Sequence, residues 1–144
     1  MKRWFAIALV VAVAPSLYAE GKQSVKPGQW QITVTHEMVG APFTPPPMSI
    51  SRCITPAEST DPKKLAQHKG SENCEMKDMK VDGNHVTYKM VCNRNGKTVT
   101  GEGEMTYEPD HYYGTTTIEM DNPRAGGHMK MVQHMDGKRT GDCK

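Results

Sequence analysis

The sequence predicts a mainly β fold: an antiparallel meander forming a small barrel or a strongly curved sheet, with one or two short helical turns near residues 56–68. Three observations lead to this. Short runs rich in Val, Thr, Tyr and Met recur every roughly 10 to 15 residues, and turn residues separate them. No long helical period follows the signal-like start of the chain. A chain of 144 residues has room for about one domain.

The N-terminus has the pattern of a signal peptide over residues 1–19. Lys2 and Arg3 precede an eleven-residue apolar run, and a small-residue cleavage signal ends at Ala19. That run is too short to span a bilayer, and no later stretch is apolar for even ten residues. We therefore expect a periplasmic or secreted protein, with residues 20–144 forming a single disulfide-stapled β-domain that has no integral membrane span.

The charge of the mature chain argues against a nucleic-acid partner. Removing residues 1–19 takes away two of the 18 basic residues and none of the 16 acidic ones, so the remainder is formally neutral. It has no basic block and no nucleic-acid-binding motif.

The four cysteines are expected to form two disulfides, because such bridges persist in the compartments to which a signal peptide leads. They are Cys53, Cys74, Cys92 and Cys143. A zinc site is the alternative, but no C-x-x-C pair and no Cys–His pair has the spacing of a zinc finger.

A hairpin selects one of the three connectivities. If the turn cluster 82–84 is a three-residue loop, Cys74 faces Cys92 and Met76 faces Met90 on the same side of the two strands. Cys53 and Cys143 then form the second bridge.

The same register pairs Asp78 with Tyr88 and Lys80 with Val86 near the turn, which is less regular. A two-residue loop would shift every pair by one.

The first strand is predicted from the alternation of Trp30, Ile32 and Val34 with polar residues. Trp30 is either a core anchor or a ring on which a ligand stacks. Residues 40–47 contain four prolines and should form an exposed, extended loop, and residues 48–54 should form a second strand.

Two short helical turns follow this strand. Thr55-Pro56-Ala57-Glu58 has the residues of a capping box, and Asp61-Pro62-Lys63-Lys64-Leu65 repeats the pattern. Pro62 separates the two turns, and Gly70 ends the second.

From Cys74 onward, strands and turns alternate. Gly101 and Gly103 lie inside one run and indicate a bulge or a sharp coil of the sheet. The expected turns are Asp82-Gly83-Asn84, Asn95-Gly96, Glu108-Pro109-Asp110, Asp121 to Gly127 and Asp136-Gly137.

Methionine replaces leucine in this chain. Residues 20–144 contain ten Met, but only one Leu, Leu65, and one Phe, Phe43. Thioethers fill irregular cores, form adaptable apolar binding surfaces or bind soft metals. The residues expected to take part in ligand binding are Trp30, Tyr88, Met90, Met129, Met131 and Arg139.

Copper is the metal that the segment 128–135 suggests, because it holds three Met and two His. In a strand, Met129 and Met131 would lie on one face while His128 and His134 lie on the other. We therefore expect no metal site there, and we expect the Met face to pack against methionines of other strands.

No catalytic motif is present: there is no G-x-S-x-G, no H-E-x-x-H, no glycine-rich phosphate loop before a helix and no C-x-x-C. The sequence predicts a protein that is not an enzyme and has no cofactor. The residue Arg139 either pairs with Asp142 or is held ready for an anionic ligand.

Several motifs together resemble a bacterial exported family catalogued as domain of unknown function 3617. The resemblance covers nearly all of the mature chain and implies an exported protein with no assigned catalytic residue. The motifs are Lys26-Pro27-Gly28-Gln29-Trp30, Cys53-Ile54-Thr55-Pro56-Ala57-Glu58, Cys74, Tyr88-Lys89-Met90-Val91-Cys92 and Gly137-Lys138-Arg139-Thr140-Gly141-Asp142-Cys143.

Three functions remain as hypotheses. The first is a non-catalytic exported protein that binds a small apolar ligand or a partner in the cell envelope. The second is a structural or assembly protein of the envelope, and the third is periplasmic copper handling.

Overall fold

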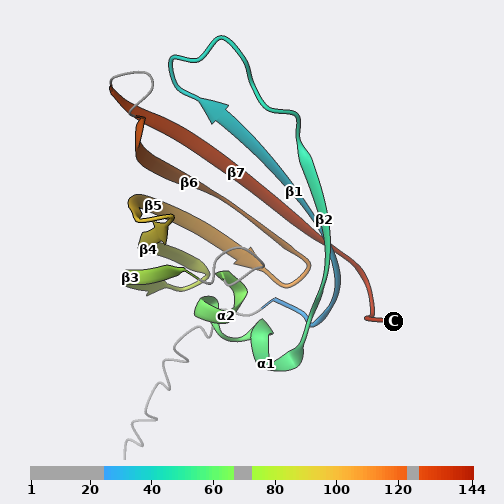
Figure 1. Cartoon of the computed structure of the whole chain (residues 1–144). Coiled ribbons are helices and arrows are strands. Elements are labelled where there is room, and N and C mark those ends of the chain that lie inside the picture. Colours follow the sequence, from blue (N-terminus) through green and yellow to red (C-terminus); the bar gives the residue numbers. More distant parts are fainter. Residues whose placement is uncertain (1–24, 67–72, 123–126) are drawn as a thin grey trace, which may run out of the picture.

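The computed structural model describes residues 25–66, 73–122 and 127–144 (Figure 1). The expected signal peptide at 1–19 and the expected helix end at Gly70 lie outside these residues.

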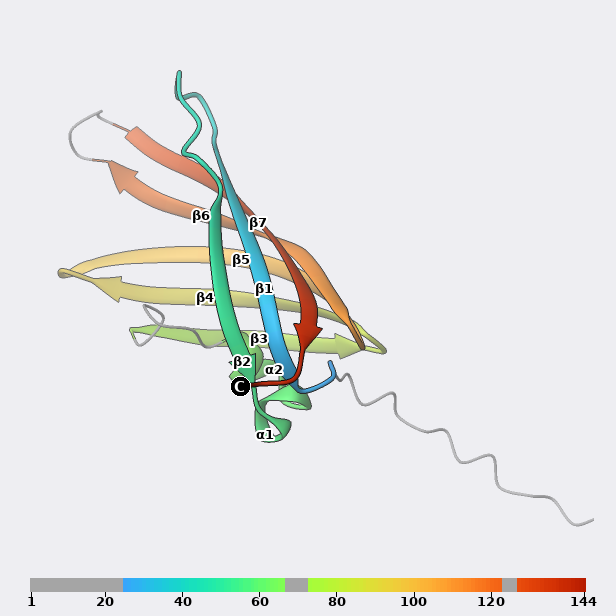
Figure 2. The ribbon, with the colours of Figure 1, turned by 90° about the vertical axis from the view of Figure 1, so that its right-hand side faces the viewer.

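Seven strands form one antiparallel sheet in the order β2-β1-β7-β6-β5-β4-β3. The sheet is strongly curved but not closed, with β2 and β3 at its two edges (Figures 1 and 2). This confirms the curved sheet and not the closed barrel. The strands are β1 (Gly28–Met38), β2 (Met48–Ile54), β3 (Cys74–Asp82), β4 (His85–Arg94), β5 (Lys97–Glu108), β6 (His111–Asn122) and β7 (Gly127–Gly141).

The meander is continuous from β3 to β7, and β1 then inserts between β7 and β2. Segments from the two ends of the chain therefore lie side by side: Gln29 pairs with Gly141 and Met38 pairs with Met131. Because this pairing is long-range, it joins the first hairpin of the chain to the meander.

The β3–β4 turn differs from the expected three-residue loop. Asp82 pairs with His85, so the loop has two residues, and Gly83 adopts a left-handed φ of 59°. A bulge between Lys77 and Lys80 then restores the register that places Cys74 opposite Cys92. Asp78 lies in that bulge with a φ of 49°.

The expected pairs next to that turn are wrong as a result. Lys80 pairs with Thr87 and not with Val86, whose partner is Val81. The short turn shifts the register by one residue, and the bulge compensates for the shift further along the hairpin.

The turn expected at Asp136-Gly137 is also wrong, because β7 runs through both residues without interruption. Gly137 is buried opposite Tyr112, whose ring fills the space that a Gly137 side chain would take. Glycine here serves close packing within a strand and not a change of direction.

Four glycines on one face of the sheet explain its curvature, because the absence of their side chains leaves space on the inner face. Each lies directly opposite a large side chain that covers it: Gly101 under Met90, Gly103 under Tyr88, Gly114 under Met105 and Gly137 under Tyr112. Since the register continues unbroken past Gly101 and Gly103, these two residues mark a coil of the sheet and not a bulge.

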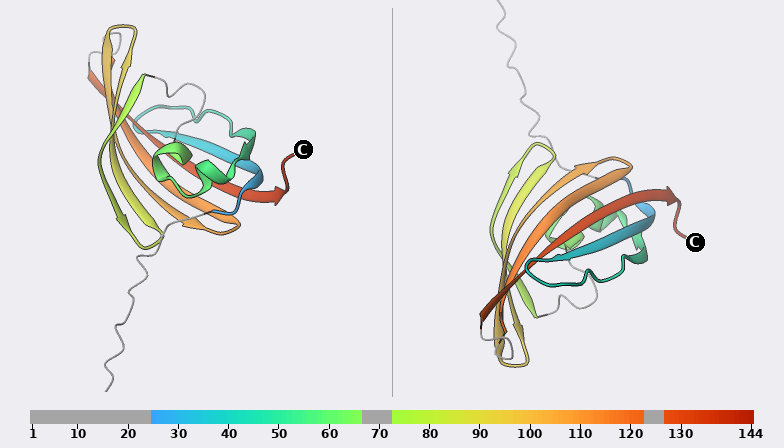
Figure 3. Two further views of the ribbon diagram at one scale, coloured as in Figure 1. Left: turned by 90° about the horizontal axis from the view of Figure 1, so that it is seen from below. Right: turned by 90° about the horizontal axis from the view of Figure 1, so that it is seen from above.

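Two short helices lie within the concavity of the sheet, at one end: α1 (Pro56–Ser59) and α2 (Pro62–Ala66) (Figure 3). They confirm the predicted helical turns. Leu65 of α2 packs against the core. The buried core residues are Val25, Trp30, Ile32, Val34, Ile54, Val86, Met105, Tyr107 and Tyr112. Among the described residues, no helix has the length and apolar character needed to cross a bilayer.

Candidate functional site

Cross-strand pairing arranges the concave face into rows of side chains that run across the strands. One row consists mostly of thioethers, and we call it the thioether row. It passes through Met76, Met90, Gly101, Ile118, Met131 and Met38, each paired with the next on six successive strands. Because paired residues of antiparallel strands share a face, these side chains form one continuous stripe.

The thioether row lies away from the core that α1 and α2 cover. Its five methionine and isoleucine side chains are buried or half-buried, yet none belongs to the core cluster. Beyond it, Met120 pairs with Met129, and both are also half-buried. Methionine's unbranched side chain adapts to irregular surfaces, so this end of the concave face is apolar and deformable.

A second row, which we call the polar row, lies between the thioether row and the core. It passes through Tyr88, Gly103, Thr116, Gln133 and His36, again one pair after another. The Tyr88 and Thr116 hydroxyl oxygens are 2.7 Å apart and share a hydrogen bond. Burial raises the pKa of Tyr88, although that hydrogen bond acts in the opposite direction. The phenol therefore stays neutral.

Neither row contains an Asp, Glu, Lys or Arg residue. The charged side chains that flank the row members in sequence lie on the convex face; Lys89, for example, approaches Asp78 and Glu102 there at 3.9 and 3.6 Å. The part of the concave face that the two rows cover thus offers apolar side chains, hydroxyl groups, an amide and an imidazole, whereas the Arg52–Glu58 pair lies at the end that α1 and α2 cover.

The residues expected to bind a ligand have different positions. Tyr88, Met90 and Met131 lie in the two rows, and Met129 lies beside them. Trp30 is fully buried, with a relative exposure of 0%. Its indole Nε1 donates to the Lys26 carbonyl at 3.1 Å, and its ring packs against Tyr112.

Arg139 lies at the end of the sheet where β1 begins, apart from the two rows. Its Nε donates to the Pro27 carbonyl oxygen at 3.0 Å, and its Nη2 donates to Asp142 Oδ1. A side chain on Gly28 would overlap both Arg139 and the Gly141 carbonyl. The guanidinium therefore ties the start of β1 to the last residues of the chain.

The structure holds two disulfides, Cys53–Cys143 and Cys74–Cys92. The first joins β2 to the segment after β7 and spans 90 residues of sequence, with the Cα atoms 5.5 Å apart. The second links the directly paired residues of the β3–β4 hairpin and spans 18 residues. Between them the bridges hold each edge strand of the sheet.

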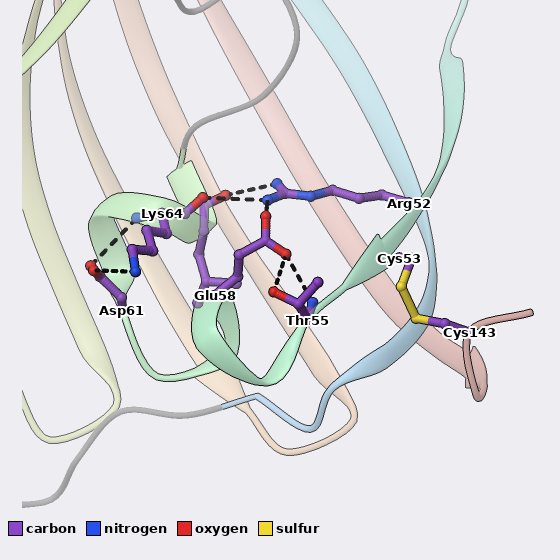
Figure 4. Close-up of polar contacts among 8 residues, drawn as sticks. Arg52, Cys53, Thr55, Glu58, Asp61, Lys64 and Cys143 are labelled. Carbon is purple, nitrogen blue, oxygen red and sulfur yellow. Dashed lines mark hydrogen bonds and ion pairs between the residues drawn. A yellow bond between two sulfur atoms is a disulfide. The ribbon is translucent and has the colours of Figure 1, made fainter.

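The two helices are held to the sheet by Arg52, which the sequence patterns did not single out. From β2, its guanidinium donates to the Leu65 carbonyl at 3.2 Å and to Glu58 Oε1 at 2.8 Å (Figure 4). The other carboxyl oxygen of Glu58 accepts from the Thr55 amide at 2.8 Å, which completes the predicted capping box. Arg52 and Leu65 are 13 residues apart in sequence, and no local pattern relates them. Only the tertiary fold therefore brings Arg52 to α2.

The hydrogen bond from the Thr55 amide is the largest influence on the pKa of Glu58. Together with the Thr55 hydroxyl and the Arg52 guanidinium, and against the opposing effect of burial, it lowers that pKa to about 2. The Arg52–Glu58 ion pair connects β2 to α1 and has a structural role.

A shallow groove of about 300 Å³ lies on the opposite, convex face. Its polar side chains come from β1, β6 and β7: Thr33, Thr35, Tyr113, Thr115, His134 and Asp136. Asp136 also lies 2.8 Å from the Nε2 atom of His111.

In the part of β7 over residues 128–135, the methionine and histidine side chains lie on opposite faces, as the alternation predicts. Met131 lies on the concave face, whereas His134 lies on the convex face, with its Nε2 atom 3.9 Å from Glu37. Within residues 25–66, 73–122 and 127–144, no group of three or more His, Cys, Asp or Glu side chains is arranged to hold a metal ion.

The fold and its concave face define an open antiparallel β-domain, bridged by disulfides at both edges, with a core at one end and a thioether-lined surface at the other. The chain belongs to the family described as protein of unknown function (DUF3617), whose model matches residues 25–143. No curated protein and no solved structure matches the chain.

Proposed function

We propose that this protein is a non-catalytic, exported binding module, and that its concave face holds an elongated amphiphile with an apolar chain and an uncharged polar group. The observation that carries the proposal is the thioether row, which crosses six strands next to the uncharged polar row. Two disulfides support an oxidising location, because such bridges persist outside the cytoplasm.

The dimensions of the thioether row suit a long alkyl chain. Neighbouring strands lie about 4.8 Å apart, so the five intervals from Met76 to Met38 span about 24 Å along the curved sheet. An alkyl chain laid along this stripe would contact thioethers from β3, β4, β7 and β1. Removing each CH₂ group from water contributes about 0.8 kcal/mol to binding.

The side chains of the polar row determine which polar group the ligand can carry. Gln133 and His36 are paired at one end of the row, and the hydrogen-bonded Tyr88 and Thr116 lie nearer the other end. Since neither row has an Asp, Glu, Lys or Arg side chain to pair with a charged group, a carboxylate or an ammonium group would lose hydration without compensation. A hydroxyl, ester or amide group fits these donors and acceptors.

The proposal is tested by displacement of N-phenyl-1-naphthylamine, a dye that fluoresces in apolar sites. Competitors are an alcohol, a carboxylic acid and an ammonium compound with alkyl chains of equal length. We expect the alcohol to displace the dye at the lowest concentration. Failure of all three competitors would contradict the module, whereas a preference for the acid would contradict only the uncharged polar group.

Two matched variants locate the site. Met131→Gln removes a thioether from the concave face, and Lys130→Gln introduces the same amide on the convex face of the same strand. We expect at least tenfold weaker dye binding for Met131→Gln and no change for Lys130→Gln. Equal binding by both variants, with unchanged melting curves, would place the ligand elsewhere.

A further inference from the structure

The two edges of the open sheet are built differently. In β3, five of the nine residues are charged, and the strand contains the bulge at Asp78. Charges and bulges prevent further strands from adding to an edge. β2 has neither protection: its register with β1 is regular from Met48 to Ile54, and Arg52 is its only charged residue.

Most of the exposed apolar side chains also lie on β2 and on the connection that leads from β1 to it. Four of the six large hydrophobic residues that the structure exposes belong to residues 39–50. They are Val39 at 53%, Phe43 at 63%, Met48 at 50% and Ile50 at 42% relative exposure. Residues 39–51 contain no charged residue. A contiguous uncharged, apolar segment of this kind is typical of an interaction surface.

The backbone of β2 is ready to pair. Its neighbour in the sheet is β1 alone, and among the described residues no backbone hydrogen bond links its other side to another segment. Gln29 and Gln31 donate to the side chains of Ser51 and Ser49 at 2.7 and 2.9 Å, which holds the strand flat against β1. Figures 1 and 2 both show β2 as the outermost strand on its side of the sheet.

We infer that β2 is a dimer interface, on which β2 of a second copy of this chain adds in the antiparallel direction. A two-fold axis beside Ile50 places Ile50 opposite Ile50, Ser49 opposite Ser51, and Met48 opposite Arg52.

When identical strands pair, like charges of the two copies must not lie opposite each other. In this register the two Arg52 side chains do not face each other, and each is already paired with Glu58 at 2.8 Å. The lack of charge over 39–51 thus favours a second copy, whereas five charged residues on β3 disfavour self-pairing there.

The test is sedimentation velocity of the oxidised protein at concentrations from about 1 to 100 µM. We expect a monomer–dimer equilibrium. Ile50→Lys places two ammonium groups opposite each other and should raise the dissociation constant at least tenfold. Val81→Lys is the matched control, because Val81 is a similarly exposed apolar residue, at 50% against 42% for Ile50, on the other edge.

A monomer throughout this range would overturn the inference and leave the edge to a strand of another protein. A dimer that Val81→Lys disrupts, or open-ended oligomers, would overturn it as well. Ile50→Cys is a second measurement that does not depend on how Ile50→Lys folds. It should form a disulfide between copies under oxidation, whereas Val81→Cys should not; equal cross-linking would contradict the interface.

Discussion

Tyr112 and Gly137 lie directly opposite each other on β6 and β7, and the phenol ring of Tyr112 occupies the space where a Gly137 side chain would project. The same relationship recurs at Met90 and Gly101 and at Tyr88 and Gly103. In each pair, one large side chain fills the inner face for two residues, so the strands can curve inward without overcrowding.

The first prediction concerns this packing. Gly137→Ala puts a methyl group into the Tyr112 ring and should lower the free energy of unfolding by about 1 to 3 kcal/mol, the usual cost of overpacking. Urea denaturation measures the loss. Gly127→Ala is the control, since a methyl group there meets no atom within 4 Å. Equal midpoints for the two variants would contradict the volume explanation of the curvature.

The second prediction ranks the disulfides. Cys53–Cys143 closes 90 residues and Cys74–Cys92 closes 18, so loss of the long loop should cost more. The chain-entropy model gives about 4.5 kcal/mol against about 3 kcal/mol. Denaturant midpoints of the two double-Ser variants measure this. A larger loss on removing the hairpin bridge would show that local strand pairing outweighs loop entropy.

The third prediction concerns acid stability. The pKa of Glu58 is about 2 in the folded state against an ordinary value of 4.5. A lowered pKa stabilises the fold above pH 4.5, and this contribution is lost as the pH falls toward 2.

The Glu58→Gln variant should therefore be less stable than the original protein at pH 6, by about 1 kcal/mol for a capping interaction, and the difference should shrink at pH 2.5. Unfolding free energies at the two pH values measure this. Glu119→Gln, an exposed change on β6, is the control. A pH-independent difference would mean that Glu58 contributes through packing and not through its charge.

The fourth prediction concerns copper. Because His128 and His134 lie on the face opposite to Met129 and Met131, we expect no affinity for Cu(I) tighter than about micromolar in a competition with a chelator. Among the histidines that the structure describes, His36 shares the concave face with the thioether row. A tight one-to-one site that is lost in the Met129→Leu, Met131→Leu double variant would make metal handling the better function.

Much of the fold follows from local signals. The alternation around Trp30, the capping residues Thr55 and Glu58, and the turn residues Asn95 and Gly96 specify a strand, a helix start and a hairpin. These signals act over a few residues, where backbone preference and burial are readable from spacing.

Other features depended on contacts between distant residues. The Asp78 bulge, the continuity of β7 through Gly137 and the anchoring of α2 by Arg52 each require a neighbour that the chain supplies far away in sequence. Gly137, for example, predicts a turn when only the sequence is known, because the Tyr112 ring that packs over it comes from another strand.

The amino-acid sequence by itself determined the β class and the family, and it predicted the pairing of Cys74 with Cys92, although the register that brings them together depends on the bulge at Asp78 and not on the expected three-residue loop. The tertiary structure alone decided that the sheet stays open, that methionines from four strands line up in one row across six, and that β2 is the unprotected edge. The physical reason is that side-chain alternation assigns residues to a face within one strand, whereas register and strand order decide which faces meet.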